Sequence, residues 1–322
     1  MKTSILIHPS ELSRKWIDRM AEQGVDTLGL HPEGGRKAHL TLERMLALLE
    51  TEEFRSLLDY AISRGLRIEY EFHAAGYLVE RSLLAEHPEY FRMNEAGERV
   101  DDWNFCISCP EALDHAATRA AELTDRLYGS QEQYFFWLDD ARTGKCHCPR
   151  CRELSASDQQ LLFLNAVIGK IREKRPHATL AFLAYYETLA LPTVVTPAEG
   201  IFLEFAPLDK SRRNTAEREK YAEGIRQEAA SRAPLLTFFG KENSRVLEYW
   251  LDNSLFSGWK KPPVRFTCDA EEIREDIADY VRLGYRDIST FGCFLGEDYE
   301  ALYGEPDITP FTDAARAYKE GE

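Results

Sequence analysis

Short apolar segments and longer amphipathic segments alternate along nearly the whole sequence of 322 residues. The short segments have the length and composition of strands in a buried sheet, and the longer ones space their apolar residues as helices do. This alternation predicts an α/β fold, because parallel strands need crossover connections that are usually helices. The eight expected strands are residues 3–8, 25–31, 66–73, 133–139, 179–186, 201–206, 234–239 and 286–292.

Eight strand–helix units predict a single (β/α)8 barrel that occupies residues 1–322 as one domain. The sequence contains no linker, low-complexity tract or internal repeat. Residues 77–110 are too long for a simple turn, so we expect a loop insertion after the third strand. The main helices are expected at residues 42–63, 111–127, 157–174 (capped by Ser157), 215–231 and 270–283.

The charge of the chain limits its partners. A net charge of −15 disfavours binding to nucleic acids or to anionic membranes, because both would repel the protein. No apolar run reaches the length of a transmembrane helix, and no basic region followed by an apolar stretch opens the chain. We therefore predict a cytoplasmic protein with no membrane or nucleic-acid partner, unless a leader has been removed.

The sequence has seven cysteines, and three of them form the motif Cys146-x-Cys148-x-x-Cys151. These are too close together for mutual disulfides, and thiolates at this spacing suit a tetrahedral zinc ion. Cys106 is the expected fourth ligand, with Cys109 and His147 as alternatives, and four protein ligands would make the zinc structural. The other interpretation is three free thiols in a loop. Cys268 and Cys293 are expected to be ordinary core thiols.

Two adjacent carboxylates, Asp139 and Asp140, follow the aromatic run of the fourth strand. The carboxyl ends of barrel strands form the active-site face, so a catalytic role is expected for at least one of them. The alternative is that one acid caps the next helix or pairs with Arg142. Glu204 stands inside an apolar strand, where it is either a nucleophile or base or a buried partner of an arginine.

Other polar and aromatic residues near the expected strand ends are candidates for binding a substrate. The strand-end residues are equally open to a structural interpretation as hydrogen-bonded groups, and for a single tryptophan such as Trp103 core packing is the favoured interpretation. We expect the strand-end residues His31, His73, Asp139, Glu187, Glu204 and Lys241 to lie at one rim of the barrel. The full set of binding candidates is His31, Glu71, His73, Trp103, Tyr185, Tyr186, Glu187, Lys241 and Glu242.

Several motifs taken together resemble a known family. They are His87-Pro-Glu-Tyr-Phe91, Asn104-Phe-Cys106, Trp137-Leu-Asp-Asp140, the strand 201–207 and Glu248-Tyr-Trp-Leu-Asp252. Over most of the chain they resemble the domain of unknown function 4838, which is similar to barrel glycoside hydrolases. Part of that family is classed as glycoside hydrolase family 163, which acts on N-acetylglucosamine linkages in N-glycans. The cysteine pattern also resembles the zinc site of family 42 β-galactosidases.

The resemblance implies a glycoside hydrolase that acts on an oligosaccharide, retains configuration and has a structural zinc. By similarity to hexosaminidase barrels, Asp140 would be the general acid and Asp139 would orient the 2-acetamido group of the substrate, with Glu204 as the alternative second group. Many relatives have Asn-Asp where this chain has Asp139-Asp140, and many are exported with extra domains. The rival hypothesis is a non-catalytic carbohydrate-binding or sensing barrel. A zinc-dependent hydrolase is disfavoured because the cysteine site would be coordinatively full.

Overall fold

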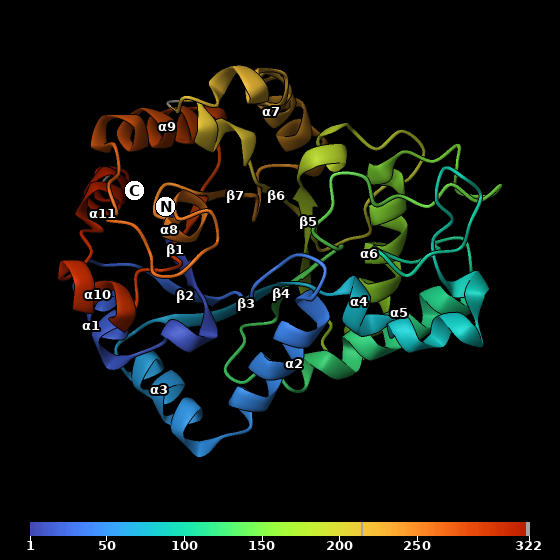
Figure 1. Cartoon of the computed structure of the whole chain (residues 1–322), viewed down its shortest axis with the longest axis horizontal. Helices are drawn as coiled ribbons and strands as arrows, with labels where there is room; N and C mark the ends of the chain where they lie inside the picture. The colour runs from blue at the N-terminus through green and yellow to red at the C-terminus, as the bar shows by residue number, and fades with distance from the viewer. Residues whose placement is uncertain (214, 320–322) are drawn as a thin grey trace. The chain divides into compact units, whose positions relative to one another are not determined.

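The computed structural model describes residues 1–213 and 215–319 (Figure 1). Among these residues, eight parallel strands form a closed barrel in chain order from β1 to β8, with helices between the strands. The predicted (β/α)8 fold is therefore confirmed. The strands are β1 (Lys2–Ile7), β2 (Thr27–Leu30), β3 (Arg67–His73), β4 (Gln133–Trp137), β5 (Thr179–Ala184), β6 (Ile201–Phe205), β7 (Arg245–Glu248) and β8 (Asp287–Phe291).

The chain divides into two compact units, each built from separate stretches of sequence. The first unit contains Met1–His31, Glu52–Glu69 and Glu204–Glu322, and the second contains Pro32–Thr51 and Tyr70–Leu203. In the first unit β1 pairs with both β2 and β8, and β7 pairs with β8. In the second unit β4 pairs with the end of β3 and with β5. The assignment of the whole chain to one domain stays a prediction.

The first unit has a charged group in its interior. Arg245, the first residue of β7, is fully buried and contacts Glu69 of β3 at 3.0 Å and Asp287 of β8 at 3.2 Å. It also donates a 2.9 Å hydrogen bond to the Ser4 hydroxyl of β1. Because a buried charge is tolerated only when it is paired, these acids are what allow an arginine in this strand.

The helices are amphipathic or buried segments between the strands, and short 3-10 helices lie in the loops, among them η1 (Pro9–Glu11), η4 (Tyr186–Leu189) and η5 (Asp209–Arg212). The α-helices are α1 (Arg14–Glu22), α2 (Ala38–Leu49), α3 (Glu52–Ser63), α4 (Ala75–Leu78), α5 (Pro110–Thr124), α6 (Ala156–Arg172), α7 (Arg218–Phe239), α8 (Asn253–Phe256), α9 (Ala270–Leu283), α10 (Glu297–Tyr303) and α11 (Thr309–Arg316). None of the helices in the described part of the chain is long and apolar enough to cross a membrane.

The predicted seventh strand was wrong. Residues 234–239 are the last turns of α7, in which Leu235 and Leu236 are buried while Phe238 is exposed. The real strand β7 is Arg245–Glu248, which has a charged residue at each end. A strand with charged residues at both ends does not look like a buried apolar segment. The partners that neutralise these charges are distant along the chain, so the sequence pattern did not indicate a strand here.

Two helix boundaries also differ from the predictions. The expected helix 42–63 is two helices, since α2 ends at Leu49 and α3 begins at Glu52. Helix α6 is capped by Ser155, whose hydroxyl accepts a hydrogen bond from the backbone of Asp158. Ser157, the predicted cap, lies inside the helix and donates its hydroxyl hydrogen to the carbonyl of Ala190.

The predicted insertion after β3 is confirmed in the second unit. It runs from the end of β3 to the start of α5 and includes η2 (Arg81–Ala85) and η3 (Pro88–Tyr90). Antiparallel bridges join Phe91 to Phe105 and Met93 to Arg99, so the insertion folds back on itself. This segment supplies contacts to the loop that follows β4.

Candidate functional site

The carboxylate of Asp139 is held from three sides within the second unit. Oδ1 accepts a 3.2 Å hydrogen bond from the backbone N–H of Gly76, and Oδ2 accepts one of 2.7 Å from Asn104. Oδ2 also forms an ion pair with Arg81, and the Asp139 side chain is only 5% exposed. A carboxylate that is this fully engaged positions its loop, because few of its lone pairs remain for another ligand.

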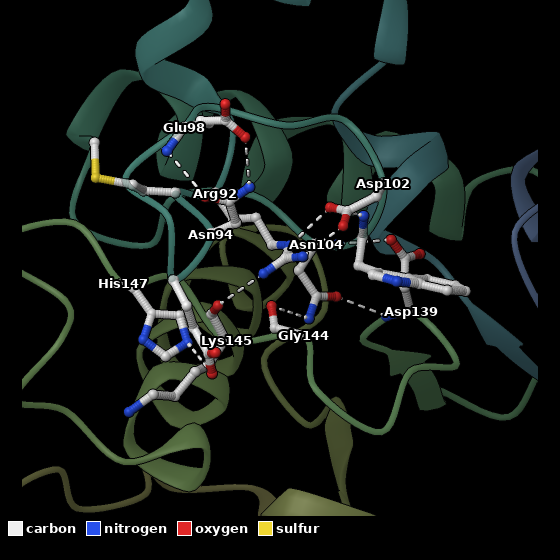
Figure 2. Close-up of polar contacts among 12 residues, drawn as sticks. Arg92, Asn94, Glu98, Asp102, Asn104, Asp139, Gly144, Lys145 and His147 are labelled. Atoms are coloured by element: carbon white, nitrogen blue, oxygen red, sulfur yellow. Dashed lines mark hydrogen bonds and ion pairs between the residues drawn. The ribbon is translucent and has the colours of Figure 1, made fainter.

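Asn104 connects the insertion to the loop after β4, as Figure 2 shows. Its side-chain oxygen accepts a 2.8 Å hydrogen bond from the backbone of Asp139, and its amide donates one of 3.0 Å to the carbonyl of Gly144. Arg92 makes a second connection between the same two segments. Its guanidinium forms an ion pair with Asp102 and donates a 3.4 Å hydrogen bond to the carbonyl of Lys145. The loop that carries the two acids is thus fixed along its length.

Asp140 has a different environment from its neighbour. Its Oδ1 accepts a 3.0 Å hydrogen bond from the hydroxyl of Tyr185, which directly follows β5. A β-carbon built on Gly34 would lie 3.2 Å from Asp140 Oδ2 and 3.2 Å from the His73 ring, so glycine allows the backbone to approach both groups. His73 donates from Nδ1 to the carbonyl of Leu138 at 2.6 Å. The structure therefore brings Asp140, His73 and Tyr185 together at the ends of three neighbouring strands.

Glu187 and its neighbours form the next part of this rim. Glu187 Oε2 accepts a 2.9 Å hydrogen bond from the backbone N–H of Gly144, and the rings of Tyr185 and Tyr186 are 4.0 Å apart. The guanidinium of Arg142 lies 4.0 Å above the Tyr186 ring. Asp139, Tyr185 and Glu187 all line a cavity of about 40 Å³. These aromatic and acidic groups are of the kinds that bind sugar rings and hydroxyls.

The four cysteines predicted to bind zinc lie together and are buried. The ligand atoms of Cys106, Cys146, Cys148 and Cys151 are all within 4.8 Å of one another. The sulfur of Cys106 is 3.7 Å from that of Cys148 and 4.0 Å from that of Cys151. A zinc–sulfur bond of about 2.3 Å gives a tetrahedron whose edges are about 3.8 Å, so this cluster has the dimensions of a zinc site. It can hold a metal ion.

The surroundings favour the thiolate form of Cys106, whereas the hydrogen bond to Cys106 raises the pKa of Cys146 to about 11 and also raises the pKa of Cys151. Hydrogen bonds from Cys146 and Cys151, aided by Arg99, hold the pKa of the Cys106 thiol well below its usual range. Gln159 of α6 accepts from the backbone of Cys146 at 2.8 Å and donates to the Cys151 carbonyl at 3.0 Å. This side chain fixes the loop between the thiolates, as residues around metal ligands commonly do.

The structure distinguishes Cys106 from the two alternative ligands. Cys109 is directed to Glu111, with its sulfur 3.4 Å from a carboxylate oxygen. His147 lies with its Nε2 3.9 Å from Glu95, and its backbone donates to the carbonyl of Met93. Neither belongs to the cluster of four within 4.8 Å.

Glu204 lies in the first unit, with its carboxylate fully buried 3.9 Å from Arg245. The two residues are also paired in register between β6 and β7. This geometry favours the second interpretation made from the sequence, a buried partner of an arginine. Glu71 of β3 is fully buried as well. Trp103 is partly exposed in the insertion, and the guanidinium of Arg36 lies 6.0 Å above its ring.

The placement of Lys241 and Glu242 beyond a strand was wrong. Both residues precede β7, because the predicted strand before them is part of α7. The Lys241 side chain lies against Gly284, which ends α9 just before β8. Both therefore lie at the amino ends of strands, away from the carboxyl ends that form active sites in such barrels. His31 does follow β2, and its ring contacts Phe291 with centroids 5.0 Å apart.

Two residues that position the site had little or no signal in the sequence. Arg81, the partner of Asp139, stands in a segment without periodicity, and the pair is separated by 58 residues. Asn104 was part of a motif, but its bonds to Asp139 and Gly144 depend on how the insertion folds back. Both contacts are long-range, so spacing could not reveal them.

The fold is shared with glycoside hydrolase barrels. A β-galactosidase from the psychrophilic Marinomonas ef1 is similar with a TM-score of 0.52 and 14% identity, over 90% of this chain and 54% of that one. The GH20 catalytic modules of the pneumococcal exo-β-D-N-acetylglucosaminidase StrH are similar with a TM-score of 0.54 and 12% identity, over 98% of this chain and 84% of that one. Cel5A of Thermotoga maritima is similar with a TM-score of 0.52 and 10% identity, over 97% of this chain and 96% of that one. At these identities the similarity concerns the fold.

The model of the family described as a domain of unknown function (DUF4838) matches residues 50–229. The chain belongs to this family, and the resemblance seen in the sequence is confirmed. The matched segment contains Asp139, Asp140 and all four clustered cysteines. No curated protein matches the sequence.

Proposed function

We propose that this protein is a glycoside hydrolase that acts on an oligosaccharide, with Asp140 as the general acid. The observation that carries the proposal is the position of Asp140, which follows β4 and accepts a hydrogen bond from Tyr185. A general acid must reach the leaving oxygen and must be oriented by its neighbours. The glycoside hydrolase fold of the neighbours supports this reading.

The contrast between the two acids supports the choice of Asp140. Asp139 is nearly buried and is occupied by Arg81 and by two backbone N–H groups. Asp140 is partly exposed and adjoins His73 and Tyr185. In this proposal Asp139 positions the loop, Asp140 transfers the proton, and the rim residues His73, Tyr186, Glu187 and Trp103 bind sugar.

A second catalytic group is needed to stabilise or capture the sugar cation. Asp139 pairs with Arg81, and Glu204 lies beside Arg245, so neither is well placed to act as a protein nucleophile. This favours a nucleophile carried by the substrate, which in an N-acetylhexosamine is the 2-acetamido oxygen. Such a reaction would retain configuration. A barrel of similar fold is named an exo-β-D-N-acetylglucosaminidase, which is consistent with this substrate class.

The zinc in this proposal is structural. The four buried thiolates would fill a tetrahedral coordination sphere and leave no place for a water or a substrate. The metal would join the insertion, through Cys106, to the loop after β4. That loop carries Asp140, so the metal would help to hold the acid in position.

Turnover of aryl glycosides tests the proposal. With a leaving group that needs protonation, Asp140→Asn should lower kcat/KM by about 10²- to 10⁴-fold, whereas a dinitrophenyl leaving group should reduce the loss. Wild-type enzyme should prefer 2-acetamido glycosides over the matching 2-hydroxy glycosides. Glu204→Gln should keep most of the activity. Full activity of Asp140→Asn on the poor leaving group would end the proposal.

A non-catalytic carbohydrate-binding barrel is the second candidate. It is favoured by one observation, namely that the carboxylates of Asp139 and Glu204 are both paired with arginines. Wild-type protein that binds oligosaccharides by calorimetry but hydrolyses none of them would support this candidate. Turnover that depends on Asp140 would exclude it.

A further inference from the structure

A second cluster of metal-binding residues lies in the first unit, away from the four cysteines in sequence. His8 follows β1, Glu11 ends η1 (Pro9–Glu11), and Cys293 follows β8. One ligand atom from each lies within 4.8 Å of the others. The exposed fractions are 7% for His8, 6% for Glu11 and 1% for Cys293. A nitrogen, an oxygen and a sulfur donor therefore converge in a buried place.

The pairing of the first and last strands brings these residues together. Strands β1 and β8 are neighbours, and just past the end of β8 the N–H of Gly292 donates to the carbonyl of Leu6 in β1 at 2.7 Å. The N–H of Gly296 donates to Glu11 Oε1 at 3.2 Å. A β-carbon on Gly296 would lie 3.2 Å from the Glu11 side chain, so glycine allows the two loops to touch.

The imidazole of His8 is oriented as a metal ligand would be. Its Nδ1 lies 2.8 Å from the carbonyl oxygen of His31. A carbonyl can only accept, so Nδ1 carries the hydrogen and Nε2 presents its lone pair. Metal-binding histidines usually donate the other ring N–H to a carbonyl or carboxylate in this way. This contact is independent of the clustering of the three residues.

The other two donors are also fixed in place. Glu11 Oε2 accepts from the backbone N–H of His8 at 3.3 Å, and its Oε1 is held by Gly296. The sulfur of Cys293 lies 3.7 Å from the carbonyl of Leu6. A metal would bind Glu11 as the carboxylate and Cys293 as the thiolate, and a divalent ion would balance both buried charges.

We propose that His8, Glu11 and Cys293 bind a divalent metal of the zinc type, separate from the four-cysteine site. Imidazole, carboxylate and thiolate are all zinc ligands, and three protein ligands leave a fourth position for a water or another small ligand. The metal joins the loop after β1 to the loop after β8, where the two ends of the barrel sequence meet.

The metal content of the chain and its variants tests this site. Protein purified in the presence of zinc and desalted is measured by elemental analysis. Cys293→Ser should bind one equivalent less than wild type, and so should His8→Gln. Cys268→Ser is the matched control, because Cys268 lies outside both cysteine-containing clusters, and it should keep the wild-type content. If both sites are occupied, the wild-type protein contains two zinc ions per chain.

Cobalt provides a second readout that does not depend on a variant folding. Wild-type apoprotein titrated with Co²⁺ should take up two equivalents with different spectra, because one site has four sulfur ligands and the other has one. Circular dichroism shows which variants are folded. The proposal is overturned if folded Cys293→Ser and His8→Gln keep the full wild-type content, or if wild type binds only the four-sulfur equivalent.

Discussion

The hydroxyl of Tyr185 donates a 3.0 Å hydrogen bond to Oδ1 of Asp140, joining the ends of β5 and β4. If Asp140 is the acid, Tyr185 orients it for proton transfer. We expect Tyr185→Phe to lower kcat/KM on a poor leaving group about five-fold, since a hydrogen bond of this kind contributes about 1 kcal/mol. Tyr60→Phe removes a hydroxyl that bonds Asp18 outside the candidate site, so it is the control and should change kcat/KM little. A Tyr185→Phe enzyme with unchanged kinetics would show that this bond does not position the acid.

The two adjacent acids should differ in their effect on stability. Asp139→Asn weakens the pairing of this buried carboxylate with Arg81 and should lower the free energy of unfolding by about 1.5–3 kcal/mol, the range for hydrogen bonds to charged groups. Asp140→Asn should cost much less, because Asp140 is partly exposed. Denaturant unfolding of both variants measures the difference. Equal losses would contradict the positioning role of Asp139.

Removal of the metal from the four-cysteine site should destabilise the protein. Because metal binding to folded protein adds directly to folding free energy, Cys148→Ser should lose one zinc equivalent and melt at a lower temperature than wild type. Elemental analysis and thermal unfolding measure the two effects. Cys109→Ser, whose sulfur faces Glu111, is the control and should keep its metal. A Cys148→Ser protein with wild-type metal content would refute the site.

Asp158 of α6 should make stability depend on pH. Burial raises its pKa, but hydrogen bonds from Ser155 and from the backbone of Val194 and Val195 outweigh this and hold the pKa well below the usual 3.8. An acid with a lowered pKa in the folded state stabilises the protein above its unfolded pKa and loses that effect as pH falls. Asp158→Asn should therefore cost about 1.5–3 kcal/mol at pH 7.

The difference between wild type and Asp158→Asn should shrink as the pH falls below about 4, where the unfolded carboxyl takes up a proton. Denaturant unfolding at several pH values measures it. Asp125→Asn is a control, because that exposed carboxylate pairs with Lys174 and Arg175 at the surface and should contribute little. A constant difference between pH 7 and pH 3 would be the contrary result.

Local patterns in the sequence determined the class of fold and part of the candidate site. Strand and helix periods differ, so the alternation of segments was enough to predict the barrel. Asp139 and Asp140 lie just beyond the end of β4, and the spacing of Cys146, Cys148 and Cys151 places these three cysteines in one loop. These features depend on residues that are neighbours in the chain.

Tertiary structure decided the features that depend on distant partners. The apolar run 234–239 suits a strand or a helix equally, and packing made it the end of α7. The charges of β7 are stable there because Arg245 meets Glu69, which is 176 residues away. His8 and Cys293 lie at opposite ends of the sequence and converge because β1 pairs with β8. Sequence spacing cannot predict such contacts, because they form only when distant strands pair in the folded barrel.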